Sequence, residues 1–428
     1  MSQLLRAPYN RNVMDTSIEQ RLLSRKNPLG AGQDVVFPDY AGYCIVSIPS
    51  LIASVLGTDE NPSPLSDIAQ AFDSYDRVVL LILDGFGFRK AQALFRKFPD
   101  SVLKELGERG SLTPLTSVYP STTVAALTSL STGLSPLEHG MIGYRLYLRE
   151  IAAITNMIRF TTHGNPRPES AFAIGLNPET LFLQPTFCER LGASGVSSHS
   201  VLPHHISGSG LSKALYRGST ESHSAVSLPD MFVRTREILA NSRGKTFVSL
   251  YWPNLDSVAH VLGPDSESYR DEFCAVDAAI RQGLIGQTDN TLLIVTSDHG
   301  FVPMAPEDYL LLNSEFNADR ALLMPPVGEP RASYLFTRDG NQDLIQNAFR
   351  QPREDGLICL ESQDLIKSGL LGTNTPHPEI ANRIGNLALL STGSGGIFQD
   401  YPDAVLLRGM HGGLTEHEML VPLIVAPL

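Results

Sequence analysis

Three apolar segments, each followed by a carboxylate, constrain the fold of this chain more than any other feature of its sequence. The first, RVVLLILDGFG at 77–87, places six consecutive apolar residues before Asp84. Similar segments occur at 246–252 and 291–300. Continuous apolar runs of this length are typical of strands that are buried on both faces of a parallel sheet. We therefore expect these three segments to be central strands.

Helical periodicity lies between these strands. In the segment 266–285, the apolar residues Phe273, Val276 and Ile280 recur at a spacing of three to four. That spacing places them on one face of a helix. Strands that alternate with helices predict an α/β fold, in which a mostly parallel central sheet is sandwiched by helices.

The carboxylates follow the predicted strands closely. Asp84 and Asp298 come directly after two of them, and Asp256 follows the third by a few residues. Ligands of open α/β sheets gather at the carboxyl ends of the strands. We therefore expect the three carboxylates to share one site.

Changes in polarity and in strand pattern along the sequence predict three regions within its 428 residues. We expect an N-terminal arm (1–40), an α/β core (41–304 plus 396–428) and a smaller inserted α/β cap (305–395). After the cap, the chain is expected to return to the core at 403–407 and to close with a strand at 419–427.

The composition excludes some classes of partner. A net charge of −12 argues against a stable nucleic-acid partner, because such proteins carry basic stripes. No signal peptide is visible, and no uncharged stretch approaches the roughly 20 residues that span a bilayer. The four cysteines form no CxxC pair, which favours reduced thiols. We expect a soluble, cytoplasmic protein without a membrane partner; the sequence carries no signal for an oligomeric state.

Thr123 is a candidate nucleophile. It follows Pro120 and Ser121 and opens an apolar helical segment at 124–130. One interpretation is a simple helix start with a hydroxyl side chain as its cap. The other is a hydroxyl held at the positive end of a helix, beside free N–H groups that can bind a phosphate oxygen. Coordination to a metal would activate such a hydroxyl.

Further candidate metal ligands come in short motifs. Asp256 and His260 are four residues apart, so a helix would place both on one face. Asp298 and His299 end a buried strand, where ionisable side chains need water, a partner or a metal. His411 lies in GMHGG, whose glycines allow close backbone approach. Each motif alone also fits a chance pair or an ordinary turn.

Taken in order, five motifs resemble those of the alkaline phosphatase superfamily and, within it, the type I phosphodiesterase/nucleotide pyrophosphatase family. The motifs are LDGFG, YPSTTVAALTSLSTG, LDSVAH, SDHG and MHGG. The resemblance covers about 77–145, 246–302 and 403–425. It implies an alkaline-phosphatase-like fold and a site for two divalent metal ions.

The resemblance also implies a role for each residue. One metal would be held by Asp84, Thr123, Asp298 and His299, and the other by Asp256, His260 and His411. Thr123, rather than Thr122, takes the position of the nucleophile. Three imidazoles favour zinc over magnesium, which prefers oxygen ligands, with manganese and iron as the alternatives.

One departure from the family pattern concerns substrate binding. Within HGMIGY, the phosphodiesterases of the family usually carry an asparagine that bonds a phosphoryl oxygen, and this chain has Tyr144 there. A phenol could donate a similar hydrogen bond, whereas the adjacent Arg145 offers a bidentate grip on a dianion. Both residues are candidate substrate contacts, and the preference for diesters over monoesters stays open.

The expected activity is hydrolysis of phosphodiester or nucleotide pyrophosphate bonds through a phospho-threonine intermediate on Thr123. The substrate would be a small phosphorylated molecule, with nucleotides among the candidates. The alternatives are a phosphomonoesterase with the same site, a metal-dependent phosphosugar mutase and a non-catalytic binding protein. Such mutases usually carry a serine nucleophile and a large inserted domain, whereas 145–245 is short here. A sulfatase would need a C/S-x-P-x-R motif, which the nucleophile segment lacks.

Overall fold

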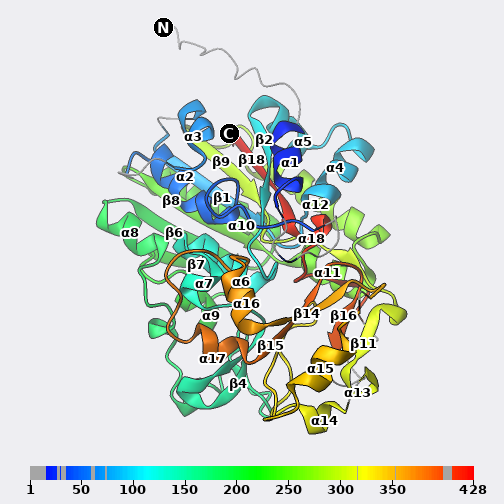
Figure 1. The fold of residues 1–428 in the computed structure, drawn as a ribbon. Coiled ribbons are helices and arrows are strands. Elements are labelled where there is room, and N and C mark those ends of the chain that lie inside the picture. The colour runs from blue at the N-terminus through cyan, green and yellow to red at the C-terminus, as the bar shows by residue number, and fades with distance from the viewer. Residues whose placement is uncertain are drawn as a thin grey trace, which may run out of the picture.

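The structure is a computed structural model, shown in Figure 1. It describes residues 16–26, 29, 35–58, 63–72, 75–315, 317–351, 353–398 and 407–428. The predicted return of the chain at 403–407 therefore lies outside the described residues except for Leu407. Among the described helices, none is both long enough and apolar enough to cross a lipid bilayer.

A seven-stranded sheet carries the larger part of the molecule (Figure 1). Its strands, in spatial order, are β2 (Ser111–Thr116), β18 (Leu420–Pro427), β9 (Thr291–Thr296), β1 (Arg77–Leu83), β8 (Thr246–Trp252), β6 (Ser197–Pro203) and β7 (Glu221–Ala225). Among the described strands of this sheet, β18 runs antiparallel to both of its neighbours, and the other neighbouring pairs are parallel. The three predicted central strands are β1, β8 and β9, and β1 pairs in parallel with both of the others. The predicted fold class is confirmed.

Helices cover both faces of this sheet. Alternate side chains of a strand point to opposite faces, so a strand that is apolar throughout presents an apolar surface on each face. Val78, Leu80 and Ile82 of β1 pack into one apolar cluster, and Val79, Leu81 and Leu83 into another. The first face is covered by α1 (Thr16–Leu23), α2 (Ile48–Val55), α3 (Ser66–Ala71), α6 (Thr123–Thr132), α8 (Phe187–Ala193) and α9 (Gly210–Leu215). The second is covered by α4 (Phe88–Lys97), α5 (Val102–Arg109), α10 (Leu228–Asn241), α11 (Asn254–Leu262) and α12 (Glu267–Gly283).

A second seven-stranded sheet lies beneath the first in Figure 1 and is antiparallel throughout. In spatial order it contains β14 (Leu357–Glu361), β15 (Leu387–Ser391), β13 (Ala332–Leu335), β12 (Val327–Glu329), β3 (Arg145–Leu148), β4 (Ala153–Asn156) and β5 (Thr161–Thr162). It therefore takes three strands from 145–162, a stretch that the predicted division assigned to the core. The division itself stays a prediction.

Short elements complete the described chain. Two-stranded sheets join β10 (Val302–Pro303) to β17 (Gly409–Met410) and β11 (Tyr309–Leu311) to β16 (Gly396–Phe398). The remaining α-helices are α7 (Pro136–His139), α13 (Leu312–Glu315), α14 (Ala318–Ala321), α15 (Gln342–Ala348), α16 (Ser362–Lys367), α17 (Ile380–Ile384) and α18 (Glu416–Met419). The 3-10 helices are η1 (Ile45–Ser47), η2 (Arg149–Ile151), η3 (Phe172–Ile174), η4 (Pro178–Thr180) and η5 (Pro306–Asp308).

Candidate active site

Thr123 is the first residue of α6, and its hydroxyl lies at the centre of the site. Its Oγ1 is 3.2 Å from Nε2 of His299. Thr122 occupies the capping position, but its side chain makes no capping bond and donates instead to Glu329. The first N–H groups of a helix have no partner within it, and they favour a bound anion. α6 therefore begins at Thr123 without a side-chain cap, and the role of the Thr123 hydroxyl as a nucleophile stays a prediction.

One group of candidate metal ligands follows β1 and β9. Ligand atoms of Asp84, Asp298 and His299 lie within 4.8 Å of one another, and all three residues are buried. Nε2 of His299 is 3.4 Å from Oδ1 of Asp84 and 3.4 Å from Oδ2 of Asp298. The carboxyl ends of the two parallel strands bring these side chains together.

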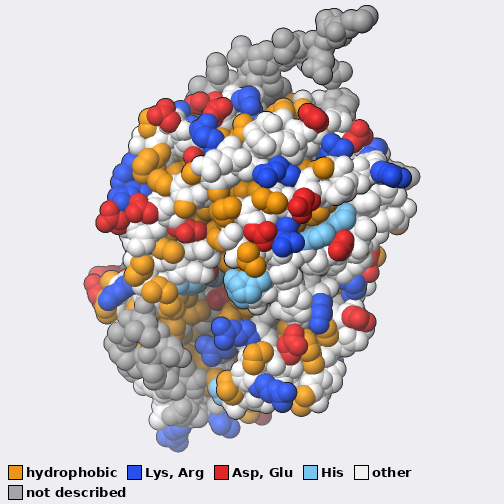
Figure 2. All heavy atoms as spheres, turned by 180° about the vertical axis from the view of Figure 1, so that it is seen from behind, with side chains coloured by type: hydrophobic (Ala, Val, Ile, Leu, Met, Phe, Trp, Pro, Cys, Tyr) orange, Lys and Arg blue, Asp and Glu red, His pale blue; other side chains and the backbone are white. Residues whose placement is uncertain are grey.

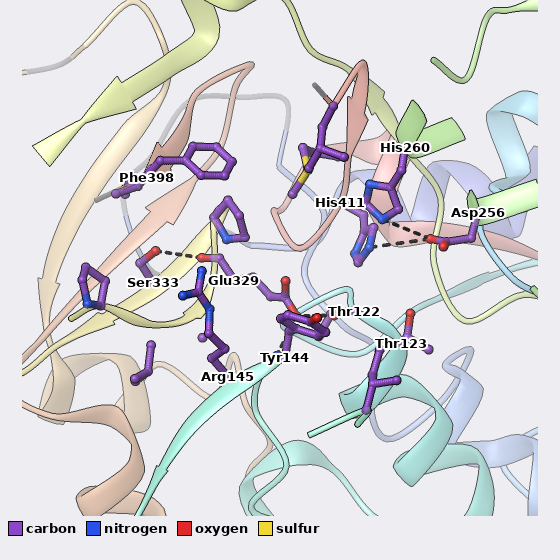
Figure 3. Close-up of a pocket in the computed structure, with 18 of the residues that line it drawn as sticks. Thr122, Thr123, Tyr144, Arg145, Asp256, His260, Glu329, Ser333, Phe398 and His411 are labelled. Atoms are coloured by element: carbon purple, nitrogen blue, oxygen red, sulfur yellow. Dashed lines mark hydrogen bonds and ion pairs between the residues drawn. The ribbon is translucent and has the colours of Figure 1, made fainter. Parts of the chain in front are cut away.

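A second group lies beside the first. Asp256 and His260 occupy one face of α11, with Nε2 of His260 3.4 Å from Oδ1 of Asp256. His411 comes from the segment after β17, and its Nε2 is 3.8 Å from the same Asp256 oxygen (Figure 3). The rings of His411 and His299 stack with centroids 3.7 Å apart, so the two groups are in contact.

The three imidazoles are oriented alike by the backbone. In each, Nδ1–H donates to a carbonyl oxygen, so that in the neutral ring Nε2 carries the lone pair and faces the site. The pairs are His260 with Gly409, His299 with Gly300 and His411 with Ser121, at 3.0, 3.1 and 3.0 Å. Bonds of this kind fix the tautomer and ring orientation of metal-binding histidines.

The carboxylates that face these nitrogens carry oxygens without a hydrogen-bond partner. Within the described part of the chain, Oδ1 of Asp84, Oδ1 of Asp256 and Oδ2 of Asp298 are buried and unpartnered. Burial, together with the nearby charges of Asp298 and Asp256, raises the pKa of Asp84 well above its ordinary value. Lone pairs that face buried carboxylates are stabilised only by cations, so this donor set fits divalent metal ions.

Two tyrosines that sequence analysis did not single out support Asp84. The hydroxyl of Tyr251, on β8, donates to Oδ2 of Asp84. The hydroxyl of Tyr269, on α12, donates to the carbonyl of Gly85 at 3.0 Å. Both tyrosines are buried. Only the apolar pattern of their strand and helix is visible in the sequence, because the hydroxyl partners come from another segment.

A cavity of about 610 Å³ opens beside the two ligand groups (Figure 3). The metal-ligand candidates Thr123, Asp256, His260 and His411 line one end of it. Phe398 of β16 lies at the other end, and Tyr144 and Arg145 lie between them along the wall. Much of the remaining wall is apolar and includes Ile158, Val261, Pro326, Val327, Pro330, Ile397, Leu407 and Met410.

Glu329 is a buried acid in this cavity that sequence analysis missed. Its Oε1 accepts hydrogen bonds from the Thr122 hydroxyl at 2.6 Å and from the Tyr144 backbone N–H at 2.7 Å. It is carried there by β12, where Gly328 pairs with Arg145 of β3. Burial raises the pKa of Glu329 to about 7. This residue thus ties the second sheet to the start of α6.

A buried ion pair holds the loop of His411. Arg331 bonds both carboxylate oxygens of Glu418, at 2.6 and 2.8 Å, and neither side chain is exposed. Glu418 also accepts from the backbone N–H of Gly413, two residues after His411. The remaining N–H groups of Arg331 donate to the carbonyls of Gly393, Ser394 and Gly395.

The surface charge is mixed on the face opposite to that of Figure 1. Figure 2 shows Lys and Arg side chains interspersed with Asp and Glu over the described residues of this face. Such mixing differs from the basic stripe that a nucleic-acid-binding surface presents.

Known proteins resemble this chain in sequence and in fold. A family model described as type I phosphodiesterase/nucleotide pyrophosphatase matches residues 78–355, which include six of the seven ligand candidates, all but His411. An uncharacterized pyrophosphatase/phosphodiesterase of Schizosaccharomyces pombe is 25% identical over 249 residues, 56% of this chain and 48% of that protein. The chain thus spans about half the length of this curated relative.

Solved structures share the fold. Murine ectonucleotide pyrophosphatase/phosphodiesterase 5 aligns with a TM-score of 0.61 at 16% identity, over 82% of this chain and 88% of that one. An inactive variant of it in complex with AMP aligns with a TM-score of 0.60 at 15% identity, over 82% and 87%. Phosphonoacetate hydrolase from Sinorhizobium meliloti 1021, in complex with phosphonoformate, gives 0.61 at 19% identity, over 82% and 89%.

Proposed function

The chain belongs to the type I phosphodiesterase/nucleotide pyrophosphatase family, and we propose that it hydrolyses phosphodiester or nucleotide pyrophosphate bonds in small phosphorylated molecules. The observation that carries the proposal is the position of the Thr123 hydroxyl. It lies at the start of α6, 3.2 Å from Nε2 of His299. His299 is common to two sets of three close ligand residues, Asp84 with Asp298 and Asp256 with His411.

Seven side chains would hold two divalent ions. Asp84, Thr123, Asp298 and His299 would bind one ion, and Asp256, His260 and His411 the other. Bound there, the ions supply Lewis-acid stabilisation of the attacking and leaving oxygens. The three imidazoles favour zinc, with manganese and iron as alternatives.

Thr123 would act as the nucleophile. Its proton passes to solvent, and Oγ1 attacks phosphorus in line. The bond from phosphorus to the leaving oxygen breaks, and that oxygen takes up a proton from water. The N–H groups at the start of α6 hold the phosphoryl oxygens through this step. Water then attacks phosphorus, the bond from phosphorus to Oγ1 breaks, and Thr123 regains its proton. A diester or nucleotide substrate leaves one ester group on the intermediate, so the product is a monoester such as a nucleoside monophosphate; a monoester substrate would instead release inorganic phosphate.

The ligands named for the related structures support a small phosphorylated substrate. AMP occupies the variant of the murine enzyme, and phosphonoformate occupies the bacterial hydrolase. The 610 Å³ cavity beside the ligand groups has room for a group of this size. Arg145 keeps a phosphomonoesterase as the second candidate, because an exposed guanidinium in the cavity wall can grip a dianion.

The test compares two esters and two neighbouring threonines. Chelator-stripped protein is reloaded with zinc and assayed on bis-p-nitrophenyl phosphate and on p-nitrophenyl phosphate. We expect metal-dependent turnover with preference for the diester; preference for the monoester would assign the phosphatase alternative. Absence of metal-dependent turnover on both esters, with zinc bound, would refute the hydrolase proposal and favour a binding protein or a mutase.

Thr123→Ala should abolish turnover and leave the circular dichroism spectrum unchanged. The matched control is Thr122→Ala, which removes the adjacent hydroxyl and its bond to Glu329 but keeps the proposed nucleophile. We expect this control to retain measurable turnover. Activity in Thr123→Ala, or its loss only in Thr122→Ala, would contradict the assignment of the nucleophile.

A further inference from the structure

A second group of metal-ligating side chains lies at one edge of the main sheet. His199 of β6 pairs in register with Glu221 of the edge strand β7, and His223 follows two residues along β7. Paired residues of parallel strands point to the same face, and so do residues two apart. His199 is level with Val248 of β8. The group therefore lies well before the carboxyl ends of the strands, where the candidate active site is built.

The spacing of the three ligand atoms is that of a coordination site. Nδ1 of His199 is 3.3 Å from Nε2 of His223, and this nitrogen is 3.6 Å from Oε2 of Glu221. All three atoms lie within 4.8 Å of one another. Ligands at about 2.0–2.2 Å from a tetrahedral ion are separated by about 3.4 Å. The two short separations match this value.

Hydrogen bonds within the group do not link all three ligand atoms at once. If Nδ1–H of His199 donates to Nε2 of His223, the lone pair of that nitrogen is used, and Glu221, 3.6 Å away, receives no hydrogen from either imidazole through these atoms. A hydrogen on Nε2 of His223 would have to be shared between His199 and Glu221. A single dication, in contrast, is attracted to all three ligand atoms at once.

We propose that His199, Glu221 and His223 bind one divalent transition-metal ion of the zinc type, at a site separate from the active site. Two imidazoles and a carboxylate suit zinc, cobalt, nickel or copper better than magnesium or calcium. The side chain of Glu221 is 65% exposed and that of His223 is 20% exposed, so an ion can enter from solvent and keep water as its fourth ligand.

The bound ion would join the edge strand to the sheet. Among the strands that the structure describes, β7 has a neighbour on one side only, namely β6. An ion shared by His199 and the two β7 residues adds a link across this pair. Because the ion binds the folded chain and not the unfolded one, zinc should raise the melting temperature.

The direct test counts zinc. Full-length protein is equilibrated at a fixed free zinc concentration, and bound zinc per chain is measured by elemental mass spectrometry. The wild type should hold one more zinc per chain than the double variant His199→Gln/His223→Gln. The matched control is His204→Gln/His205→Gln, an exposed pair whose ring centroids are also 5.5 Å apart but which belongs to none of the three-ligand groups among the described residues. This control should match the wild type. Equal zinc content in all three proteins would overturn the proposal.

A milder variant covers the case in which the double variant does not fold. Glu221→Gln changes one exposed carboxylate, and it should weaken zinc binding at this site on the order of tenfold or more. In the wild type, zinc should raise the melting temperature further after the active-site metal sites are filled. In Glu221→Gln, this further rise should require a zinc concentration higher by the same factor. Unchanged affinity in Glu221→Gln would remove the carboxylate from the site and refute the three-ligand proposal. These measurements use zinc alone, so their outcome is independent of phosphate ester turnover.

Discussion

The hydroxyl of Tyr251 gives the sharpest test of how the chain prepares Asp84 for a metal. It donates to Oδ2 of Asp84, while Oδ1 of the same carboxylate faces Nε2 of His299. Tyr251→Phe keeps the buried ring and removes only the donor. The Asp84 carboxylate then loses the one hydrogen bond that lowers its pKa against burial and the neighbouring carboxylates.

The expected loss of zinc affinity in Tyr251→Phe follows from the charge of the hydrogen-bond acceptor, the Asp84 carboxylate. A hydrogen bond to a charged group contributes about 1.5–3 kcal/mol. Since 1.4 kcal/mol corresponds to a factor of ten in an equilibrium constant, zinc affinity at this site should fall by about 10- to 100-fold. Outer-shell partners of metal ligands show effects of the same size.

The assay measures zinc affinity of the apoprotein by competition with a chromophoric chelator. The control is Tyr269→Phe, which removes an equally buried hydroxyl that donates to the carbonyl of Gly85, the residue after Asp84. Because that acceptor is neutral and not a ligand, this variant should lose about 1 kcal/mol of stability and keep its zinc affinity within about threefold. Equal affinity losses in the two variants, or none in Tyr251→Phe, would refute the reasoning.

Three further predictions concern the surroundings of the site. Glu418→Gln should lower the free energy of unfolding by about 3–5 kcal/mol in denaturant titrations, because it leaves the buried Arg331 charge uncompensated. Glu416→Gln, on the same short helix but partly exposed, should cost less than about 1 kcal/mol; similar losses would contradict this account. At pH 8, above the pKa of about 7 of Glu329, Glu329→Gln should raise kcat/KM for p-nitrophenyl phosphate relative to the diester by about tenfold, since it removes a negative charge that repels a dianion; an unchanged ratio would argue against that repulsion. Arg145→Ala should shift the same ratio in the opposite direction, and no shift would exclude Arg145 as a dianion contact.

The sequence predicted the central sheet because its strands carry their own signal. β1, β8 and β9 are buried on both faces, so their apolar runs are continuous and easy to recognise. Parallel pairing then brings the residues after these strands to one edge of the sheet, which is why Asp84 and Asp298 lie together. The spacing of Asp256 and His260 has a similar local basis in α11.

The second sheet carried no such signal. Its strands are short, β5 having two residues, and β3 pairs with β12 across more than 180 positions of the chain. Glu329 owes its place in the cavity to that pairing, so neither its burial nor its bond to Thr122 could be predicted locally. The pairing of His199 with Glu221 likewise exists only once β6 and β7 lie side by side.

The two sheets contribute different parts of the candidate site: the main sheet positions candidate metal ligands, and the second sheet positions charged residues that could select between substrates. The candidate metal ligands come from the residues that follow β1 and β9, from the start of α6, from α11 and from the segment after β17. The opposite wall of the cavity comes from the second sheet, where the pairing of Gly328 with Arg145 sets a buried carboxylate and an exposed guanidinium on neighbouring strands. In the proposed function, a phosphoryl group at Thr123 would meet two opposite charges, those of Arg145 and of ionised Glu329. A diester carries one negative charge and a monoester two near pH 8. We therefore expect the charges of Glu329 and Arg145 to discriminate between the two esters more strongly than bound metal ions, which would attract both.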